Sequence, residues 1–213
     1  IIIAFITYNI CYNQPMEELI SVVIPVFNEA AGIQSFLKKE LIPTLKNLKE
    51  NTEIIIVDDG STDKSLEIVK NYTFPRRITV RIVALMKNFG KELALTAGLR
   101  EAEGCAVIMI DADGQHPAEE IPRMIEKWHE GAKIVTAIRG SNTTKHKLGS
   151  RLYYILMHKA GDKNLIEGEM DFRLLDREVV DDFNQFTEHN RFTRGLIDWL
   201  GYPQEYIKVQ TKD

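Results

Sequence analysis

Short runs of apolar, mostly β-branched residues recur along the first two-thirds of the chain, and segments with helical spacing separate them. The run Glu53–Val57 has IIIV at its centre, which is typical of a strand buried on both faces. Alternation of such strands with helices predicts an α/β fold, with a mostly parallel sheet and helices on both faces. The other expected strands in this region are Ile20–Val26, Ile78–Leu85, Cys105–Ile110 and Lys133–Ile138.

Helices are expected between these strands, at Ala30–Leu41, Asp63–Asn71, Lys91–Glu103 and Pro117–Glu130. The pattern loosens after residue 140. There we expect helices at Leu148–Ala160, Glu178–Phe186 and Phe192–Leu200, and extended segments at Asp171–Leu175 and Tyr206–Gln210.

The length and the net charge of the chain limit the number of domains and the classes of protein to which it can belong. Its 213 residues suggest one large domain, and 27 basic against 31 acidic residues give a net charge of −4, which argues against a dedicated nucleic-acid binder. Residues 1–15 are interpreted as a non-native leader or, alternatively, as an added edge strand, so that residues 16–213 form the domain. No stretch is long and apolar enough to predict a membrane span.

Polar clusters follow four successive predicted strands. Ligands of parallel α/β sheets bind beyond the carboxyl ends of the strands, so these clusters are expected to share one edge of the sheet. Each cluster alone would also suit a turn or a helix cap. The clusters are Pro25–Glu29, Asp58–Asp63, Lys87–Lys91 and Asp111–His116.

The residue types in these clusters indicate a nucleotide-diphosphate site. Asp111 and Asp113 are two residues apart at a strand end, and their carboxylates, with the amide oxygen of Gln115, suit Mg²⁺ or Mn²⁺ bridging phosphate oxygens. Asp58 or Asp59 would accept hydrogen bonds from a base or ribose, and Lys91 would add positive charge toward the phosphates. The P-loop motif is absent, and no GxGxxG follows the first strand.

Taken together, the motifs resemble those of family 2 glycosyltransferases with the GT-A fold. The resemblance covers about residues 20–205 and is strongest to polyprenyl-phosphate glycosyltransferases, the dolichol-phosphate-mannose-synthase-like and bactoprenol-glucosyltransferase-like group. NFGKELALTAGL and DADGQHP form the most specific pair. The other motifs are VVIPVFNE, VDDGSTD, DFRLLDR and RFTRGLIDWLG.

The resemblance implies an inverting enzyme that moves a sugar from a UDP- or GDP-linked donor to a polyprenyl phosphate at the cytoplasmic face of a membrane. It implies a metal ion held by Asp113 and Gln115, with Asp111, Asp113 and Arg139 in catalysis. It also suggests that a C-terminal membrane-associated region is missing. The expected donor-binding residues are Pro25, Phe27, Glu29, Asp58, Asp59, Asn88, Lys91, Asp111, Ala112 and Asp113.

The acceptor prediction also rests on charge. No Asp or Glu occurs between Gly131 and Gly161, whereas six basic residues do, and such a zone would receive a lipid phosphate and anionic headgroups. A solvated basic surface is the alternative. GSNTTKHKLGS, after Arg139, matches the family poorly, and Gly114 stands where Leu is usual. The expected acceptor-phosphate residues are Arg139, Arg151, Arg173, Arg191 and Arg194, the last three being alternatively structural ion-pair partners.

Three other functions fit parts of the pattern. IMIDADGQ resembles the nucleophile loop of haloacid-dehalogenase-type phosphatases, although that loop usually lies near the chain start. A glycosyltransferase with a saccharide acceptor and a non-catalytic sugar-nucleotide-binding module are the others. His116 is a candidate acid or base, but a phosphate acceptor is mostly dianionic at neutral pH and needs no base.

Overall fold

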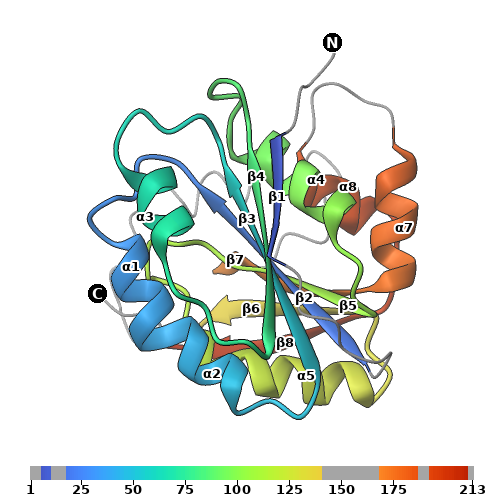
Figure 1. The fold of residues 1–213 in the computed structure, drawn as a ribbon. Coiled ribbons are helices and arrows are strands. Elements are labelled where there is room, and N and C mark those ends of the chain that lie inside the picture. The colour runs from blue at the N-terminus through green and yellow to red at the C-terminus, as the bar shows by residue number, and fades with distance from the viewer. Residues whose placement is uncertain (1–5, 11–17, 141–167, 187–191, 211–213) are drawn as a thin grey trace, which may run out of the picture.

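The computed structural model describes residues 6–10, 18–140, 168–186 and 192–210. Within them, eight strands form one sheet in the order β1-β4-β3-β2-β5-β7-β6-β8 (Figure 1). The strands are β1 (Ile6–Ile10), β2 (Leu19–Val26), β3 (Asn51–Asp58), β4 (Ile78–Ala84), β5 (Ala106–Met109), β6 (Ile134–Arg139), β7 (Glu169–Asp176) and β8 (Gln204–Val209).

The sheet is mostly parallel, as predicted. β4, β3, β2 and β5 pair in parallel, and β6 pairs in parallel with β8. β7 runs antiparallel between β5 and β6, and β1 pairs antiparallel with β4 at the edge. The carboxyl ends of six strands therefore share one edge with the beginning of β7.

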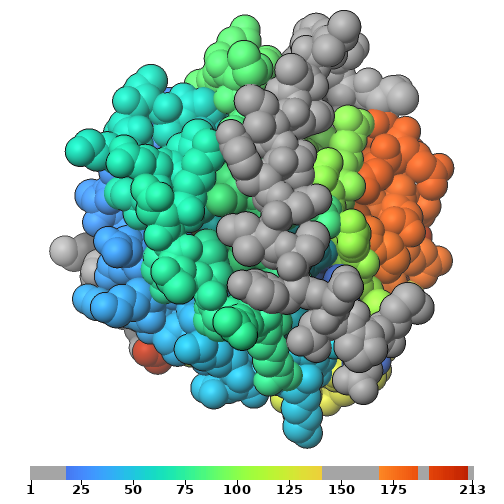
Figure 2. Space-filling model, in the orientation of Figure 1, coloured from blue at the N-terminus to red at the C-terminus, as the bar shows by residue number. Residues whose placement is uncertain are grey.

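Helices cover both faces of the sheet. One face carries α1 (Ile33–Phe36), a π-helical turn (Leu37–Leu41), α2 (Ile42–Lys46), α3 (Ser65–Asn71), a 3₁₀ turn (Ala118–Glu120) and α5 (Ile121–His129). The other face carries α4 (Lys91–Glu101), α7 (Arg177–Gln185) and α8 (Thr193–Trp199). The space-filling view shows the α1–α2 segment and α7 on opposite sides of the molecule (Figure 2).

Strand geometry explains why this sheet needs two helical layers. Successive side chains of a strand point to opposite faces, and both faces of the central strands are apolar. In β2, Val22 and Ile24 belong to the core beneath α1 and α5, whereas Val23 belongs to the core beneath α4 and α7. All three are fully buried.

The predicted strands and helices within the described residues are confirmed, with shifts at their ends. The helix expected at Ala30–Leu41 begins at Ile33 and continues to Lys46 through the π-helical turn. That turn precedes Pro43, which lacks an N–H and would crowd the preceding turn of a regular α-helix. Ile6–Ile10 forms a strand at the edge of the sheet, paired antiparallel with β4, and the division of the chain at residue 16 stays a prediction.

Part of the prediction falls elsewhere in the chain. The helix expected at Leu148–Ala160 lies outside the described residues. Among the residues that are described, none of the helices has the length and hydropathy that a membrane crossing requires.

Candidate active site

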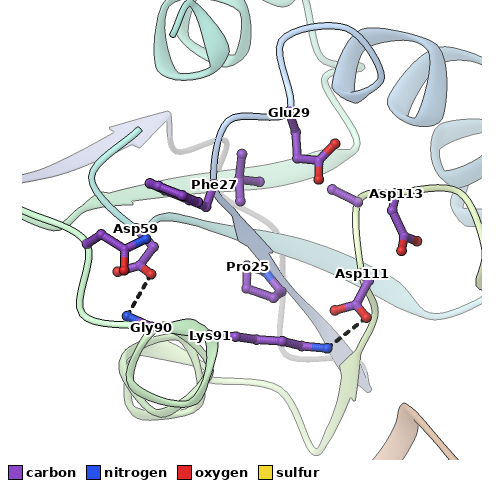
Figure 3. A pocket seen from close by; sticks show the side chains of 11 residues that line it. Pro25, Phe27, Glu29, Asp59, Gly90, Lys91, Asp111 and Asp113 are labelled. Carbon is purple, nitrogen blue, oxygen red and sulfur yellow. Dashed lines mark hydrogen bonds and ion pairs between the residues drawn. The ribbon is translucent and has the colours of Figure 1, made fainter. Parts of the chain in front are cut away.

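A pocket of about 340 Å³ lies at the carboxyl edge of β2, β3 and β5, against the first turn of α4 (Figure 3). It brings together residues from all four polar clusters noted in the sequence. Its lining consists of Pro25, Val26, Phe27, Glu29, Asp59, Asn88, Gly90, Lys91, Asp111, Ala112 and Asp113. Of the ten expected donor-binding residues, only Asp58 is absent from this lining.

The two aspartates after β3 have different surroundings. Asp59 lines the pocket and accepts hydrogen bonds from the backbone N–H groups of Phe89 and Gly90, at 2.7 and 2.9 Å. Burial raises its pKa, although these two donors act in the opposite direction. Asp58 is also buried, but it caps its own loop by accepting from the N–H of Ser61 at 3.1 Å. Asp59 is therefore the aspartate placed to meet a ligand.

Asn28 joins the loops after β2 and β3. Its φ of 56° is left-handed, a conformation that asparagine tolerates better than most residues. Asn28 Oδ1 accepts a hydrogen bond from the backbone N–H of Thr62 at 2.9 Å. The backbone N–H of the following residue, Glu29, donates to Ser65 Oγ at 2.7 Å. These contacts fix Phe27 and Glu29 at the pocket, where Phe27 is 43% exposed.

Three carboxylates gather on one side of the pocket, those of Glu29, Asp111 and Asp113 (Figure 3). Burial raises the pKa of Glu29, and the negative charges of Asp113, Asp63 and Asp111 raise it further. Such a concentration of oxygen ligands and negative charge suits a hard divalent cation.

Gln115, the other expected metal ligand, does not line the pocket. Its side chain is exposed, and its backbone N–H donates to Asp113 Oδ1 at 2.9 Å. Glu29, Asp111 and Asp113 supply the carboxylates of the pocket lining, whereas the metal-ligand roles expected for Asp113 and Gln115 stay predictions.

Lys91 carries the positive charge of the pocket. Its Nζ lies 2.8 Å from Asp111 Oδ2 and 2.8 Å from Asp171 Oδ2. Burial opposes the charge on Lys91, but the two carboxylates outweigh it and hold the lysine pKa above its usual range. Asp171 also accepts from Arg194 Nη2 at 3.1 Å. An alternating chain of charges thus runs from the pocket to α8.

Asp171 was not among the site residues expected from the sequence. The only signal was its position at the start of DFRLLDR, a motif read for its resemblance and not for this residue. Its contact with Lys91 depends on β7 reversing direction beside β5.

The arginines expected to bind the acceptor phosphate differ in their exposure and in their partners. Arg139 is exposed at the end of β6, outside the pocket lining. Arg173 is fully buried, and its guanidinium pairs with Glu169 and Asp198 at 2.7 and 2.8 Å. The acceptor prediction for Arg173 is therefore corrected: this side chain ties β7 to α8. Arg194, bonded to Asp171, is partly buried near the pocket, and Arg151 and Arg191 lie outside the described residues.

The basic zone is also smaller than expected in the part of the chain that the structure describes. Lys133 begins the stretch in sequence but lies at the opposite edge of the sheet, where it pairs with Asp176 and Glu178 at 3.0 and 2.9 Å. A strand separates it from Arg139.

Comparison with known proteins gives three concordant findings. The model described as Glycosyl transferase family 2 matches residues 21–183. Glycosyltransferase YkcC of Bacillus subtilis (strain 168) is 39% identical over 196 residues, covering 88% of this chain and 59% of YkcC. A bactoprenol glucosyl transferase of Shigella phage SfX is 39% identical over 198 residues, covering 90% of this chain and 64% of the phage protein. The chain thus spans less than two-thirds of these relatives.

A solved structure shows the same fold. Mannosyltransferase PcManGT from Pyrobaculum calidifontis, in complex with GDP-Man and Mn²⁺, superposes with a TM-score of 0.64 over 91% of this chain and 56% of that chain, at 23% identity. The predicted GT-A fold is thereby confirmed. The comparisons favour the glycosyltransferase prediction over the phosphatase alternative.

Proposed function

Because the chain belongs to glycosyl transferase family 2, we propose that it transfers a sugar, with inversion, from a UDP- or GDP-linked donor to a polyprenyl phosphate. The observation that carries the proposal is the pocket, in which an exposed aromatic ring, a buried aspartate, a lysine and a group of carboxylates converge at one sheet edge. We place the reaction on the cytoplasmic face of a membrane.

The pocket has a part for each portion of the donor. The Phe27 ring offers an apolar face to the base, and Asp59 offers a carboxylate to the base or ribose. Pro25, Asn88 and Ala112 shape the walls between these groups. Lys91 is the cation available to the diphosphate, although Asp111 and Asp171 hold it in this structure.

The diphosphate needs more positive charge than Lys91 alone supplies. Asp111 and Asp113 would hold Mg²⁺ or Mn²⁺, with Glu29 adding negative charge nearby and Gln115 as the further ligand that the family resemblance implies. A bound divalent cation would stabilise the charge that develops on the leaving nucleoside diphosphate. Mn²⁺ accompanies the nucleotide sugar in the PcManGT structure.

The acceptor assignment is supported by the bactoprenol glucosyl transferases among the relatives. A phosphate monoester is mostly dianionic at neutral pH, so the attacking oxygen needs no general base. The chain must instead offset the repulsion between this dianion and the donor diphosphate. We assign that task to Arg139, which is exposed at the pocket edge of the sheet, and to Arg194, beside Asp171.

Titration calorimetry and thermal unfolding with UDP, GDP and their sugars, each in Mn²⁺ and in EDTA, test the donor site. We expect one nucleotide to bind in Mn²⁺ and to raise the melting temperature as binding predicts. Asp113→Ala should abolish this metal-dependent stabilisation, whereas Asp181→Ala, an exposed aspartate on α7, should not. Equal affinity of the wild type in Mn²⁺ and EDTA would contradict the metal site.

A further inference from the structure

His116 occupies an unusual position at the end of the DADGQHP loop. Its side chain is buried, with the residue only 6% exposed, and its ring stacks on Phe172 of β7 with a centroid distance of 5.6 Å and an interplanar angle of 12°. Its Nδ1 accepts a hydrogen bond from the backbone N–H of Asp111 at 3.1 Å. Its Nε2 lies 3.7 Å from Asp111 Oδ2. The His116 ring therefore faces both the backbone N–H and the carboxylate of Asp111, a residue that lines the pocket.

The hydrogen bond to Asp111 replaces a strand partner. The last N–H of this segment to bond the sheet is that of Ile110, which donates to Val23 O of β2 at 3.1 Å. One residue later the chain leaves the sheet, and an N–H that is left unpaired away from water costs free energy. The chain turns back at Gly114, where φ is 74°, and delivers His116 Nδ1 to that N–H. His116 thus closes the loop that holds Asp111 and Asp113.

The same hydrogen bond selects the form of the imidazole. Nδ1 must be unprotonated to accept from an N–H, so the ring proton resides on Nε2. That nitrogen faces the Asp111 carboxylate. Backbone and side chain of Asp111 are therefore constrained by opposite sides of one ring.

Two consecutive residues of β7 support this arrangement. Phe172 stacks on His116, and Asp171 holds Lys91, whose Nζ binds Asp111 Oδ2. β7 pairs antiparallel with β5 through Met109 and Arg173, and the same register continued by two residues brings Asp171 level with Asp111. Asp111 is thus constrained by His116 and by Lys91, and β7 supports both.

We infer that His116 is a positioning residue for the metal and donor site, acting through the Asp111 N–H and not by proton transfer to substrate. The inference rests on the proposed function, because it assigns His116 to the loop that would carry the cation. Removal of a group that orients a metal ligand without touching the metal is expected to lower metal affinity by about 10–100-fold.

Two substitutions separate hydrogen bonding from packing. His116→Phe keeps a ring against Phe172 but removes the acceptor, whereas His116→Asn loses the ring and keeps an oxygen near the position of Nδ1. We expect His116→Phe to weaken Mn²⁺-dependent nucleotide binding by about tenfold or more. His116→Asn should restore most of that affinity. Binding by His116→Phe at the wild-type level, or a loss in both variants that follows their loss of stability, would overturn the inference.

Hydrogen exchange in the metal-free protein gives a readout that needs no nucleotide. The Asp111 amide should be protected in wild type and in His116→Asn and should exchange faster in His116→Phe, while the Ile110 amide stays protected in all three. If wild type binds no nucleotide, the proposed function fails, and this exchange pattern still decides whether His116 orders the loop. Unchanged protection of Asp111 in His116→Phe would overturn the inference on its own.

Discussion

Glu29 lies where burial and neighbouring carboxylates disfavour a negative charge. Burial and the nearby carboxylates of Asp113, Asp63 and Asp111 raise its pKa. A carboxyl group whose pKa is raised in the folded state binds more protons in the folded than in the unfolded protein. The free energy of unfolding therefore falls as pH rises through the range between the unfolded-state and the folded-state pKa. The ionised Glu29 therefore destabilises the metal-free protein at neutral pH.

Removal of that charge should stabilise the protein while weakening ligand binding. We expect Glu29→Gln to raise the melting temperature in EDTA at neutral pH by a few degrees at most, since 1 kcal/mol corresponds to about 2–4 °C in a chain of this size. The gain should shrink as pH falls toward the usual glutamate range. Mn²⁺-dependent nucleotide binding should weaken. Glu126→Gln, on the exposed side of α5, is the control, and identical pH profiles of wild type and Glu29→Gln would contradict the argument.

The residues of the pocket were predictable where the order of the strands alone brings their loops together. The loops after β2, β3 and β5 meet because the strands are neighbours, so the clusters that hold Phe27, Asp59 and Asp111 could be placed at one edge of the sheet, while the choice of Phe27 and Asp59 within them came from the family resemblance. Ion pairing was an alternative expected for Arg173, but its partners Glu169 and Asp198 could not be predicted, because they come from β7 and α8, whose packing no local pattern reveals.

At the scale of elements, α4 begins at the pocket, where its N-cap Gly90 and its first residue Lys91 belong to the lining. The position of α4 depends on close packing against the sheet. A Cβ added at Gly98 would clash with Val23 of β2 and lie 3.1 Å from Val57 of β3. Both valines are fully buried, so neither can move aside easily.

Gly98→Ala should therefore destabilise the protein even though alanine favours helices. Overpacking of this kind costs about 1–3 kcal/mol, more than the about 1 kcal/mol that alanine gains over glycine in a helix. Gly195→Ala in α8 is the matched control, because its added Cβ would meet the Phe192 ring at 2.5 Å, and that ring is 61% exposed and free to turn. Urea unfolding of both variants checks the prediction, and equal stabilities would contradict it.

The described elements after residue 140 lie within two residues of their expected bounds, but their arrangement in the sheet could not be predicted from sequence patterns. The extended segment expected at Asp171–Leu175 is a strand, but its place between β5 and β6 and its reversed direction follow from packing across the whole sheet. Alternating strands and helices identify a parallel sheet, whereas an inserted antiparallel strand leaves no periodic signal of its own. Asp171 and the support for His116 were missed for this reason.

For the whole molecule, the carboxyl ends of six strands and the start of β7 share one edge of the sheet, where the pocket lies. The pocket is rich in carboxylates, and a second anion approaching the donor diphosphate would meet repulsion that only nearby cations can offset. Arg139 ends β6 at this edge and is exposed, while Arg76 is exposed in the loop before β4, at the opposite edge. The two arginines therefore provide a matched pair for a charge-reversal experiment.

Reversal of charge at Arg139 should separate acceptor use from donor binding. In membranes that carry the complete gene product, we expect Arg139→Glu to lower sugar transfer to polyprenyl phosphate by about tenfold or more, which corresponds to about 1.4 kcal/mol of lost transition-state stabilisation. Mn²⁺-dependent nucleotide affinity should change little, because Arg139 lies outside the pocket lining. Arg76→Glu should leave both unchanged, since it alters the net charge equally but at the far edge of the sheet. If Arg139→Glu and Arg76→Glu transfer sugar equally well, or if the wild type glycosylates a soluble saccharide and ignores polyprenyl phosphate, the acceptor assignment is wrong even where the donor site stands.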